Sequence, residues 1–332
     1  MTTVLSPKRT ASPSSGGRSM QFILSTGLLP GLLILMCIVF AVVEPRFVDG
    51  SNLLNIARQS VFLLLIAMGQ MIVLINAQLD LSVGATVALT SVVVASVTAA
   101  SSGGPESVLL GVGAGVLLGA LIGLLNGCVV AFWKVPSFMA TLGSTSVLTG
   151  LALIISKGAP IIGLPMIFSD ALATSFVLGV PVPVLLGAVI AVGIGVFMAR
   201  TQPGRNMYAI GGNRAAALVA GINVKKTVIL AFILCSVLSS LAGILLTARV
   251  GSGEASLGAS FVMLSIAAAV LGGTSLFGGE GVLWRVVLGV AFLGVLSNGM
   301  NLLHVSSYIQ ELVIGIVLIA AVAVERLRRV TA

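Results

Sequence analysis

Two copies of a short motif place hydroxyl, aromatic and acidic side chains at corresponding positions in this sequence. Val135-Pro-Ser-Phe138 in the first half pairs with Val305-Ser-Ser-Tyr308 in the second. Hydroxyls and aromatic faces suit weak contact with a polyol, but tyrosine is also enriched where helices meet a membrane surface. Solute contact and helix packing therefore both remain open. The residues that could line a solute pathway are Ser137, Phe138, Thr141, Ser307, Tyr308 and Glu311.

Motifs that bind nucleotides or activate a nucleophile are missing. The glycine-rich range 272–279 lacks the lysine of the phosphate-binding loop GxxxxGK[ST]. His304 is the one histidine, and the three cysteines, Cys37, Cys128 and Cys235, have no CxxC spacing. We therefore expect no catalytic residue, no metal site and no cofactor in this chain, and we expect any nucleotide to bind elsewhere.

A second pair of motifs contains an acidic residue followed by serine and glycine. Asp80-Leu-Ser-Val-Gly84 recurs as Glu254-Ala-Ser-Leu-Gly258. A carboxylate at the start of a helix stabilises the positive end of the helix dipole, which favours a structural role over ion binding. The residues of this structural motif are Asp80, Ser82, Gly84, Glu254, Ser256 and Gly258.

The composition requires a lipid environment around the elements that position these residues. The 332 residues are 58% hydrophobic and 8% charged, and the mean hydropathy is +1.20. Soluble domains carry about a quarter charged residues, so a water-soluble globule is excluded. The net charge of +8 could suggest nucleic acid. However, the basic residues lie between apolar runs and form no long block, so no nucleic-acid partner is expected.

Ten apolar runs are each long enough to cross a bilayer, which takes about 20 helical residues. We expect an all-α integral membrane protein with about ten transmembrane helices over residues 20–326, a disordered basic segment at 1–19 and a basic tail at 327–332. The runs are 22–43, 57–76, 82–100, 107–132, 137–156, 177–199, 227–248, 257–277, 284–303 and 306–324.

The distribution of Lys and Arg predicts the orientation. If both termini are cytoplasmic, only Arg46, Arg58, Lys157 and Arg249 of the 17 basic residues lie outside. This bias follows the positive-inside rule for an even number of spans. Nine or eleven transmembrane spans would break this bias of basic residues toward the cytoplasmic side.

The paired motifs, together with Asn126-Gly127 and its counterpart Asn298-Gly299, predict an inverted internal repeat. Equivalent helices, the second to fifth and the seventh to tenth, differ by five places and so point in opposite directions. Inverted repeats are common in transporters, where a substrate pathway lies between the halves. A stripe of glycines in the run 107–132 indicates close helix packing; its members are Gly111, Gly115, Gly119, Gly123 and Gly127.

The connection 200–226 is the largest predicted cytoplasmic segment. Pro203-Gly204 is typical of a turn, and Asn213 and Gly221 could cap and end a short helix. This helix could be an ordinary surface helix. It could also be the surface on which a cytoplasmic partner protein drives transport, because the chain has no nucleotide-binding site of its own.

Six ordered motifs resemble the permeases of bacterial ribose-type ABC importers, from about residue 28 to the C-terminus. They are Leu79-Asp-Leu-Ser-Val-Gly84, Val135-Pro-Ser-Phe-Met-Ala-Thr-Leu-Gly143, Ala209-Ile-Gly-Gly-Asn-Arg214, Gly221-Ile-Asn-Val224, Gly272-Gly-Thr-Ser-Leu-Phe-Gly-Gly279 and Val305-Ser-Ser-Tyr308. Where the family often has Gly-Gly-Ile before Asp-Leu-Ser, this chain has Ala77-Gln78-Leu79. This departure predicts a local backbone geometry or a substrate preference that differs from the family pattern.

The resemblance implies import of a monosaccharide across the bacterial inner membrane by alternating access. It implies three partners: a cytoplasmic ABC ATPase that binds ATP and magnesium, a periplasmic sugar-binding protein, and a second permease copy or a sister permease. The range 204–222 then resembles the coupling helices that contact the ATPase. The residues expected in this contact are Gly204, Arg205, Tyr208, Gly211, Gly212, Asn213, Arg214 and Gly221.

Other functions remain open at this point. A related permease could import branched-chain amino acids or another small polar solute. A secondary transporter or channel would instead use an ion gradient and need no ATPase, although such proteins usually carry ionisable groups within their helices. An assembly scaffold would move no solute at all.

Overall fold

The protein is a bundle of helices in the computed structural model, which describes residues 15–101 and 103–330. The only sheet in these ranges is a two-stranded hairpin, β1 (Phe176–Val177) and β2 (Val180–Pro181). The longer helices are α1 (Ser15–Val43), α2 (Gly50–Ile75), α3 (Val83–Ala99), α4 (Glu106–Phe132), α5 (Ser137–Ser156), α7 (Val182–Arg200), α8 (Gln202–Gly212), α10 (Val224–Val250), α11 (Phe261–Leu271), α12 (Leu283–Leu302) and α13 (Ser307–Val330). The short ones are η1 (Pro45–Val48), α6 (Met166–Ser169), η2 (Asp170–Thr174) and α9 (Arg214–Val219).

Each of the ten predicted apolar runs contains one helix, which confirms the all-α membrane fold. Six helices are long and apolar enough to cross a membrane, namely α2, α4, α5, α7, α10 and α12. Four shorter apolar stretches lie in α1, α3, α11 and α13. The run 257–277 is helical only over Phe261–Leu271, because turns occupy both of its flanks.

The two ends of the chain fall partly outside the described residues. The predicted disordered segment 1–19 lies outside them up to residue 14, and α1 begins at Ser15. Of the predicted tail 327–332, the residues up to Val330 belong to α13, and 331–332 lie outside the described residues. Both domain boundaries stay predictions.

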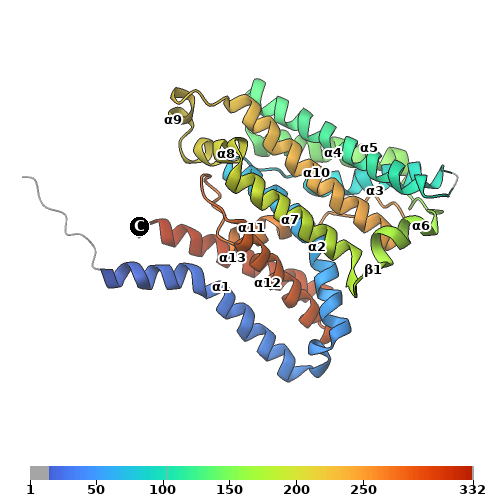
Figure 1. Ribbon diagram of the computed structural model, residues 1–332, viewed down its shortest axis with the longest axis horizontal. Coiled ribbons are helices and arrows are strands. Elements are labelled where there is room, and N and C mark those ends of the chain that lie inside the picture. The colour runs from blue at the N-terminus through green and yellow to red at the C-terminus, as the bar shows by residue number, and fades with distance from the viewer. Residues whose placement is uncertain (1–14, 102, 331–332) are drawn as a thin grey trace, which may run out of the picture.

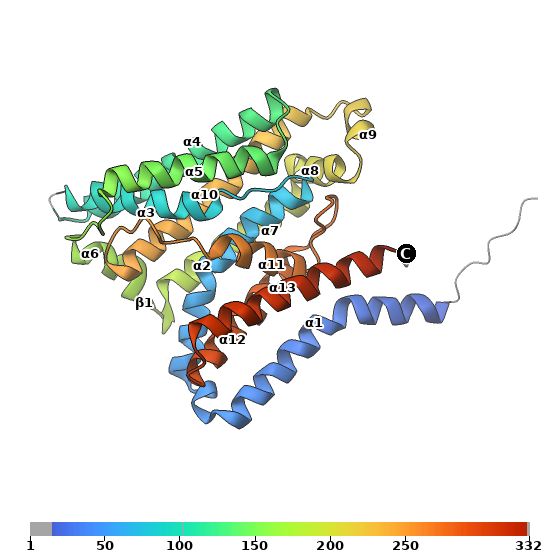
Figure 2. The ribbon, with the colours of Figure 1, turned by 180° about the vertical axis from the view of Figure 1, so that it is seen from behind.

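The centre of the bundle is formed by α2 and α10. Leu65, Ile66 and Met68 of α2 are fully buried, as is Phe232 of α10. Both views show α4 and α5 on one side of this centre, and α1 and α13 on the opposite side (Figures 1 and 2). Between α1 and the pair α2 and α12 lies a groove of about 700 Å³, lined almost entirely by apolar side chains such as Ile34, Leu53 and Val287.

The glycine stripe of α4 packs closely, as its spacing predicts: from Gly115 to Gly127 it faces α10, and Gly111 faces α3 and α6. A Cβ atom on Gly123 would lie 2.5 Å from both the Ile233 Cα and the Phe232 carbonyl oxygen. A Cβ on Gly127 would lie 2.7 Å from the Ile229 Cα. Only glycine lets the two backbones approach this closely.

Two non-helical segments, 76–82 and 251–260, precede the short helices α3 and α11. Segment 251–260 passes along α3, since a Cβ on Gly253 would meet Ala95 and a Cβ on Gly258 would meet Val87. At Gly84 and Gly258 the approach is reciprocal: a Cβ on either glycine would lie 2.6 Å from the carbonyl oxygen of the other. The two acidic motifs thus meet where the start of α3 contacts the segment before α11.

The connection between α7 and α10 contains two helices, whereas the sequence predicts one. Asn213 caps α9 by accepting a hydrogen bond from the Ala216 N–H at 3.0 Å, and Gly221 follows with φ +79°, both as predicted. The prediction of a turn at Pro203-Gly204 is wrong. Both residues lie in the first turn of α8, where Thr201 accepts a hydrogen bond from the Gly204 N–H and proline is well tolerated.

Candidate functional site

The start of α5 holds segment 76–82 in place through two side-chain oxygens. The Leu79 N–H donates to Ser137 Oγ at 3.0 Å, and the Leu81 N–H donates to Thr141 Oγ1 at 3.0 Å. Thr141 is fully buried, whereas Phe138 is 46% exposed. Ser137 and Thr141 therefore position backbone, and of the three predicted residues on α5 only Phe138 has an exposed side chain.

The other three predicted pathway residues form a separate group at the start of α13. Ser307, Tyr308 and Glu311 are all exposed, and Tyr308 is 88% exposed. In both views α13 and α5 lie on opposite sides of the bundle (Figures 1 and 2). One copy of the chain does not bring the six residues together, and their role in a pathway stays a prediction.

Asp80 is the centre of a buried polar network. Its Oδ1 accepts hydrogen bonds from the Ser82 N–H at 2.8 Å and from Ser82 Oγ at 2.6 Å. Asn126 Nδ2 donates to Ser82 Oγ at 2.9 Å, and Ser144 Oγ donates to Asn126 Oδ1. The network joins the start of α3 to α4 and α5. A buried carboxylate needs such donors, because burying a charge without partners is costly.

The second acidic motif does not sit at a helix start. Glu254 lies well before the first residue of α11, Phe261, and the intervening turns separate it from the helix dipole. Its N–H donates to Ser91 Oγ at 3.2 Å, and its Oε1 accepts from Ser252 Oγ at 3.0 Å. The prediction of a helix-terminal carboxylate is therefore wrong for Glu254, which helps to fix segment 251–260 against α3 instead.

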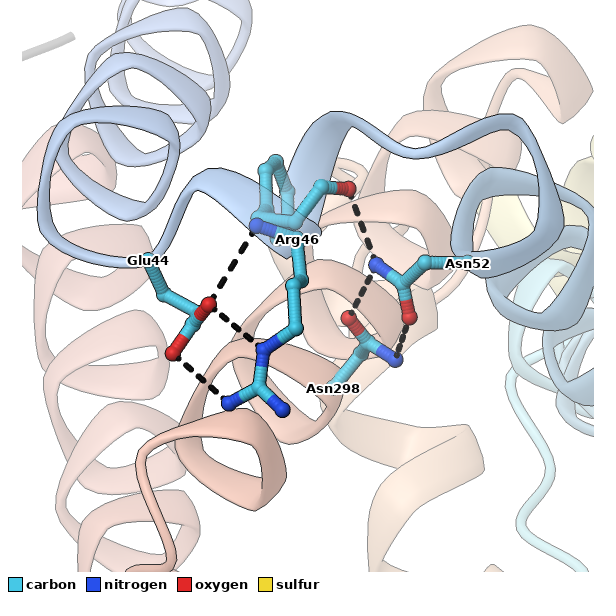
Figure 3. Close-up of polar contacts among 5 residues, drawn as sticks. Glu44, Arg46, Asn52 and Asn298 are labelled. Atoms are coloured by element: carbon cyan, nitrogen blue, oxygen red, sulfur yellow. Dashed lines mark hydrogen bonds and ion pairs between the residues drawn. The ribbon is translucent and has the colours of Figure 1, made fainter.

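At the hairpin end of the bundle, two asparagines form a reciprocal amide pair (Figure 3). Asn52 Nδ2 donates to Asn298 Oδ1 at 3.0 Å, and Asn298 Nδ2 donates to Asn52 Oδ1 at 2.9 Å. Asn52 Nδ2 also donates to the Phe47 carbonyl at 2.9 Å. The pair fixes η1 and α2 to α12. The repeat marks Asn126 and Asn298 as equivalent, but their partners differ and could not be derived from the sequence.

Beside this pair, Glu44 and Arg46 form an ion pair in the connection between α1 and α2 (Figure 3). Arg46 Nε and Nη2 donate to the Glu44 carboxylate at 2.8 and 3.0 Å, and the Arg46 N–H donates at 3.2 Å. These side-chain and backbone hydrogen bonds lower the pKa of Glu44 to about 2. The carboxylate is thus ionised at any physiological pH.

The helices α8 and α9 present two different faces. The inner face of α8 packs on the bundle through the buried residues Gly204, Met207 and Ile210, and Tyr208 Oη donates to the Gly281 carbonyl at 2.8 Å. The outer face includes Arg205 and Arg214, both exposed. On α9, Val219 is 91% exposed.

The eight residues predicted to contact a partner divide between these faces. Gly204 is buried, and Tyr208 and Gly211 are partly buried against the bundle. The exposed ones are Arg205, Gly212, Asn213, Arg214 and Gly221. Beside these five residues, the exposed apolar side chain of Val219 lies on the same two helices, so the outer surface of α8 and α9 combines cations with an apolar side chain.

A family profile described as branched-chain amino acid transport system / permease component matches residues 52–322. The chain is 41% identical to the ribose import permease protein RbsC of Bacillus subtilis strain 168, over 89% of its own length and 91% of that protein. It is 38% identical to the D-allose transport system permease protein AlsC of Escherichia coli K12, over 89% and 90% of the two chains. Identity to the L-arabinose transport system permease protein AraH of the same strain is 36%, over 90% of each chain. No solved structure matches the chain.

Proposed function

Because the chain belongs to the family of branched-chain amino acid transport system permease components, we propose that it is the membrane subunit of an ATP-driven monosaccharide importer. The observation that carries the proposal is its identity of 36–41% over about 90% of its length to permeases of ribose, D-allose and L-arabinose. These names favour a pentose or hexose over a branched-chain amino acid. Like its relatives, the chain is a multi-pass transport protein and not an enzyme.

The energy for import comes from a separate ABC ATPase. No phosphate-binding loop occurs in the sequence, and the glycine-rich range 272–279 lacks its lysine. The outer face of α8 and α9 is the docking surface for this ATPase. Its exposed cations Arg205 and Arg214, together with the exposed Val219, support this assignment.

The α8 end of the bundle faces the cytosol, in the bacterial inner membrane, with both termini on that side. Arg200 ends α7, Arg205 and Arg214 lie between α7 and α10, and Lys225 and Lys226 lie in the first turn of α10. This cluster supports the orientation through the positive-inside rule. A periplasmic sugar-binding protein would deliver the sugar to the opposite end, where the hairpin and the Asn52–Asn298 pair lie.

Translocation proceeds by alternating access in a pair of permeases. The non-helical segments 76–82 and 251–260 support this, because irregular backbone at membrane depth is tolerated where it is buried in protein or lines a cavity. Phe138, Ser307, Tyr308 and Glu311 are the predicted pathway residues that could still contact the sugar. A second copy or a sister permease completes the pathway.

Reconstitution tests the proposal. The permease would be placed in liposomes with its ATPase and binding protein, and uptake of radiolabelled D-ribose, D-allose, L-arabinose and L-leucine would be measured. We expect uptake of at least one of the sugars only when ATP is supplied. Uptake of leucine alone, or sugar uptake driven by an ion gradient without the ATPase, would contradict the proposal. Replacing Tyr308 with Ala should reduce uptake while assembly with the ATPase survives.

A further inference from the structure

We propose that loop 272–282 transmits movement of the docking helix α8 to segment 76–82, and that Tyr208 and Gly211 are the positioning residues of this connection. The inference rests on the proposed function and deepens it, since it names the route from the ATPase surface into the bundle. It also gives Tyr208 and Gly211 a role inside the permease, in place of direct contact with the ATPase.

The first step of the route joins α8 to the loop. Tyr208 on α8 is partly buried, and its hydroxyl donates to the Gly281 carbonyl at 2.8 Å. A residue that served only to contact a partner protein would present its hydroxyl outward. The bond instead ties the docking helix to the loop that connects α11 to α12.

The second step joins the loop to the end of α2. The Gly279 N–H donates to the Ile75 carbonyl at 2.9 Å. Gly211 fits against both groups only because it lacks a side chain: a Cβ at that position would collide with the Ile75 carbonyl oxygen and the Gly279 nitrogen. A Cβ on Gly278 would likewise lie 2.7 Å from the Ala77 Cβ and 2.9 Å from the Gly211 carbonyl oxygen.

Three stretches of backbone therefore meet here without intervening side chains: the end of α8, the loop, and residues 75–77. Long side chains absorb a displacement by changing rotamer, whereas packed backbones pass it on because protein interiors are close-packed. We call this contact between the end of α8, loop 272–282 and residues 75–77 the glycine joint. It is stiff because the glycines leave no side chains between the backbones.

The third step leads from this joint to the acidic motif. The chain leaves α2 at Ile75 and reaches Asp80 through segment 76–82. The backbone of Leu79 and Leu81 is hydrogen-bonded to Ser137 and Thr141, and Thr145 Oγ1 donates to the Leu81 carbonyl at 3.1 Å. A shift of α8 would thus reach the starts of α3 and α5 together, next to the predicted pathway residue Phe138.

Replacing Tyr208 with Phe tests the first step, because it removes one hydrogen bond and keeps the ring. The readout is the amount of sugar imported per ATP hydrolysed in proteoliposomes that contain the ATPase and the binding protein. D-ribose, D-allose or L-arabinose serves as the probe, according to which one the wild type imports. We expect this ratio to fall about threefold or more, with complex assembly unchanged and ATP hydrolysis within about twofold of the wild type.

Two results would overturn the inference for Tyr208. One is an unchanged ratio. The other is a proportional loss of uptake, hydrolysis and assembled complex, which would reveal a purely structural role. Absence of ATP-driven sugar uptake by the wild type would instead contradict the proposed function itself, and the inference would fall with it.

The glycine joint is tested by Gly211→Ala against Gly193→Ala. Both glycines are helical, but a Cβ on Gly193 of α7 would meet nothing within 4 Å. We expect Gly211→Ala to lower the ratio of sugar to ATP and Gly193→Ala to leave it unchanged. Equal effects of the two substitutions on this ratio would contradict a role for the glycine joint in coupling. If Gly211→Ala fails to assemble, the ratio measured for Tyr208→Phe decides the matter.

Discussion

At the scale of single residues, Ala77 occupies a backbone conformation that normally favours glycine. Its φ is +55°, in the left-handed region that costs a residue with a Cβ about 1–2 kcal/mol. The sequence resemblance marks this position as one where the family often has glycine. The departure therefore places strain where α2 meets segment 76–82.

Replacing Ala77 with Gly should raise the melting temperature of the purified protein in detergent. The exposed methyl group contributes little packing, so relief of strain dominates, and we expect a gain of about 1 kcal/mol. Ala114, in the interior of α4, is the matched control. The same change there should lower stability by about 1 kcal/mol, because glycine is a poor helix former. A lower melting temperature for Ala77→Gly than for the wild type would contradict the presence of strain at Ala77.

The ion pair of Glu44 predicts a pH dependence with a definite sign. The Arg46 side chain and backbone N–H lower the pKa of Glu44 from 4.5 to about 2 in the folded protein. Its contribution to stability is therefore fully present above pH 4.5 and is lost as the pH falls towards 2. The difference in melting temperature between wild type and Glu44→Gln should shrink over this range. When Arg46 is already replaced by Gln, adding Glu44→Gln should change the melting temperature little at any pH.

The hydrogen-bond partners of individual residues were the least predictable feature of the site. The sequence singles out Asp80 and Ser82 as one structural motif, and the structure joins them through two hydrogen bonds. Asn126 was marked only by its place in the repeat, and its bonds to Ser82 and Ser144 depend on how α3, α4 and α5 cross. Sequence spacing within one helix cannot supply that crossing. The same reason explains why Ser137 and Thr141, predicted as solute contacts, bind backbone instead.

At the scale of elements, the glycine stripe of α4 predicts how two substitutions on one helix should differ. Gly123→Ala would force the α4 and α10 backbones apart, which costs about 1–3 kcal/mol. A Cβ on Gly113 would meet nothing within 4 Å, so Gly113→Ala should be neutral or raise stability by up to about 1 kcal/mol. Thermal unfolding of both variants in detergent is the measurement. Equal destabilisation would mean that the stripe does not set the helix distance.

Apolar helices were predictable because each carries its own signal of length and hydropathy. The helix α8 carries no such signal: it is short and contains Pro203-Gly204, a pair that is usually typical of a turn. Pro203 is tolerated because it lies at the start of the helix, where its missing N–H has no partner to lose. The run 257–277 was predicted to be longer than α11 for the opposite reason, since apolar residues also fill the turns on both of its flanks.

At the scale of the whole molecule, α7 separates two features that should lie on opposite sides of the membrane. The hairpin immediately precedes α7, and α8 follows it. Leu178 in the hairpin is 99% exposed, and Val219 in α9 is 91% exposed. A cysteine at position 178 should react with an impermeant maleimide added to intact spheroplasts, and one at position 219 should react only after lysis.

The labelling needs a background without competing thiols. Cys37 and Cys128 would be replaced by Ala, whereas the buried Cys235 can stay. Labelling of position 219 in intact spheroplasts would overturn the orientation and, with it, the ATPase docking surface on α8 and α9.

The open groove beside α1 has a practical consequence for purification. In a bilayer, acyl chains from the surrounding lipid would fill it, because its walls are apolar and it opens to the outside. Beside the groove, α1 packs against α12. Lipid in the groove would therefore support a further part of the surface of this first helix. Extraction with a short-chain, delipidating detergent should loosen α1 before the rest of the bundle. Extraction into polymer-bounded native discs, which retain lipid, should keep α1 packed in place.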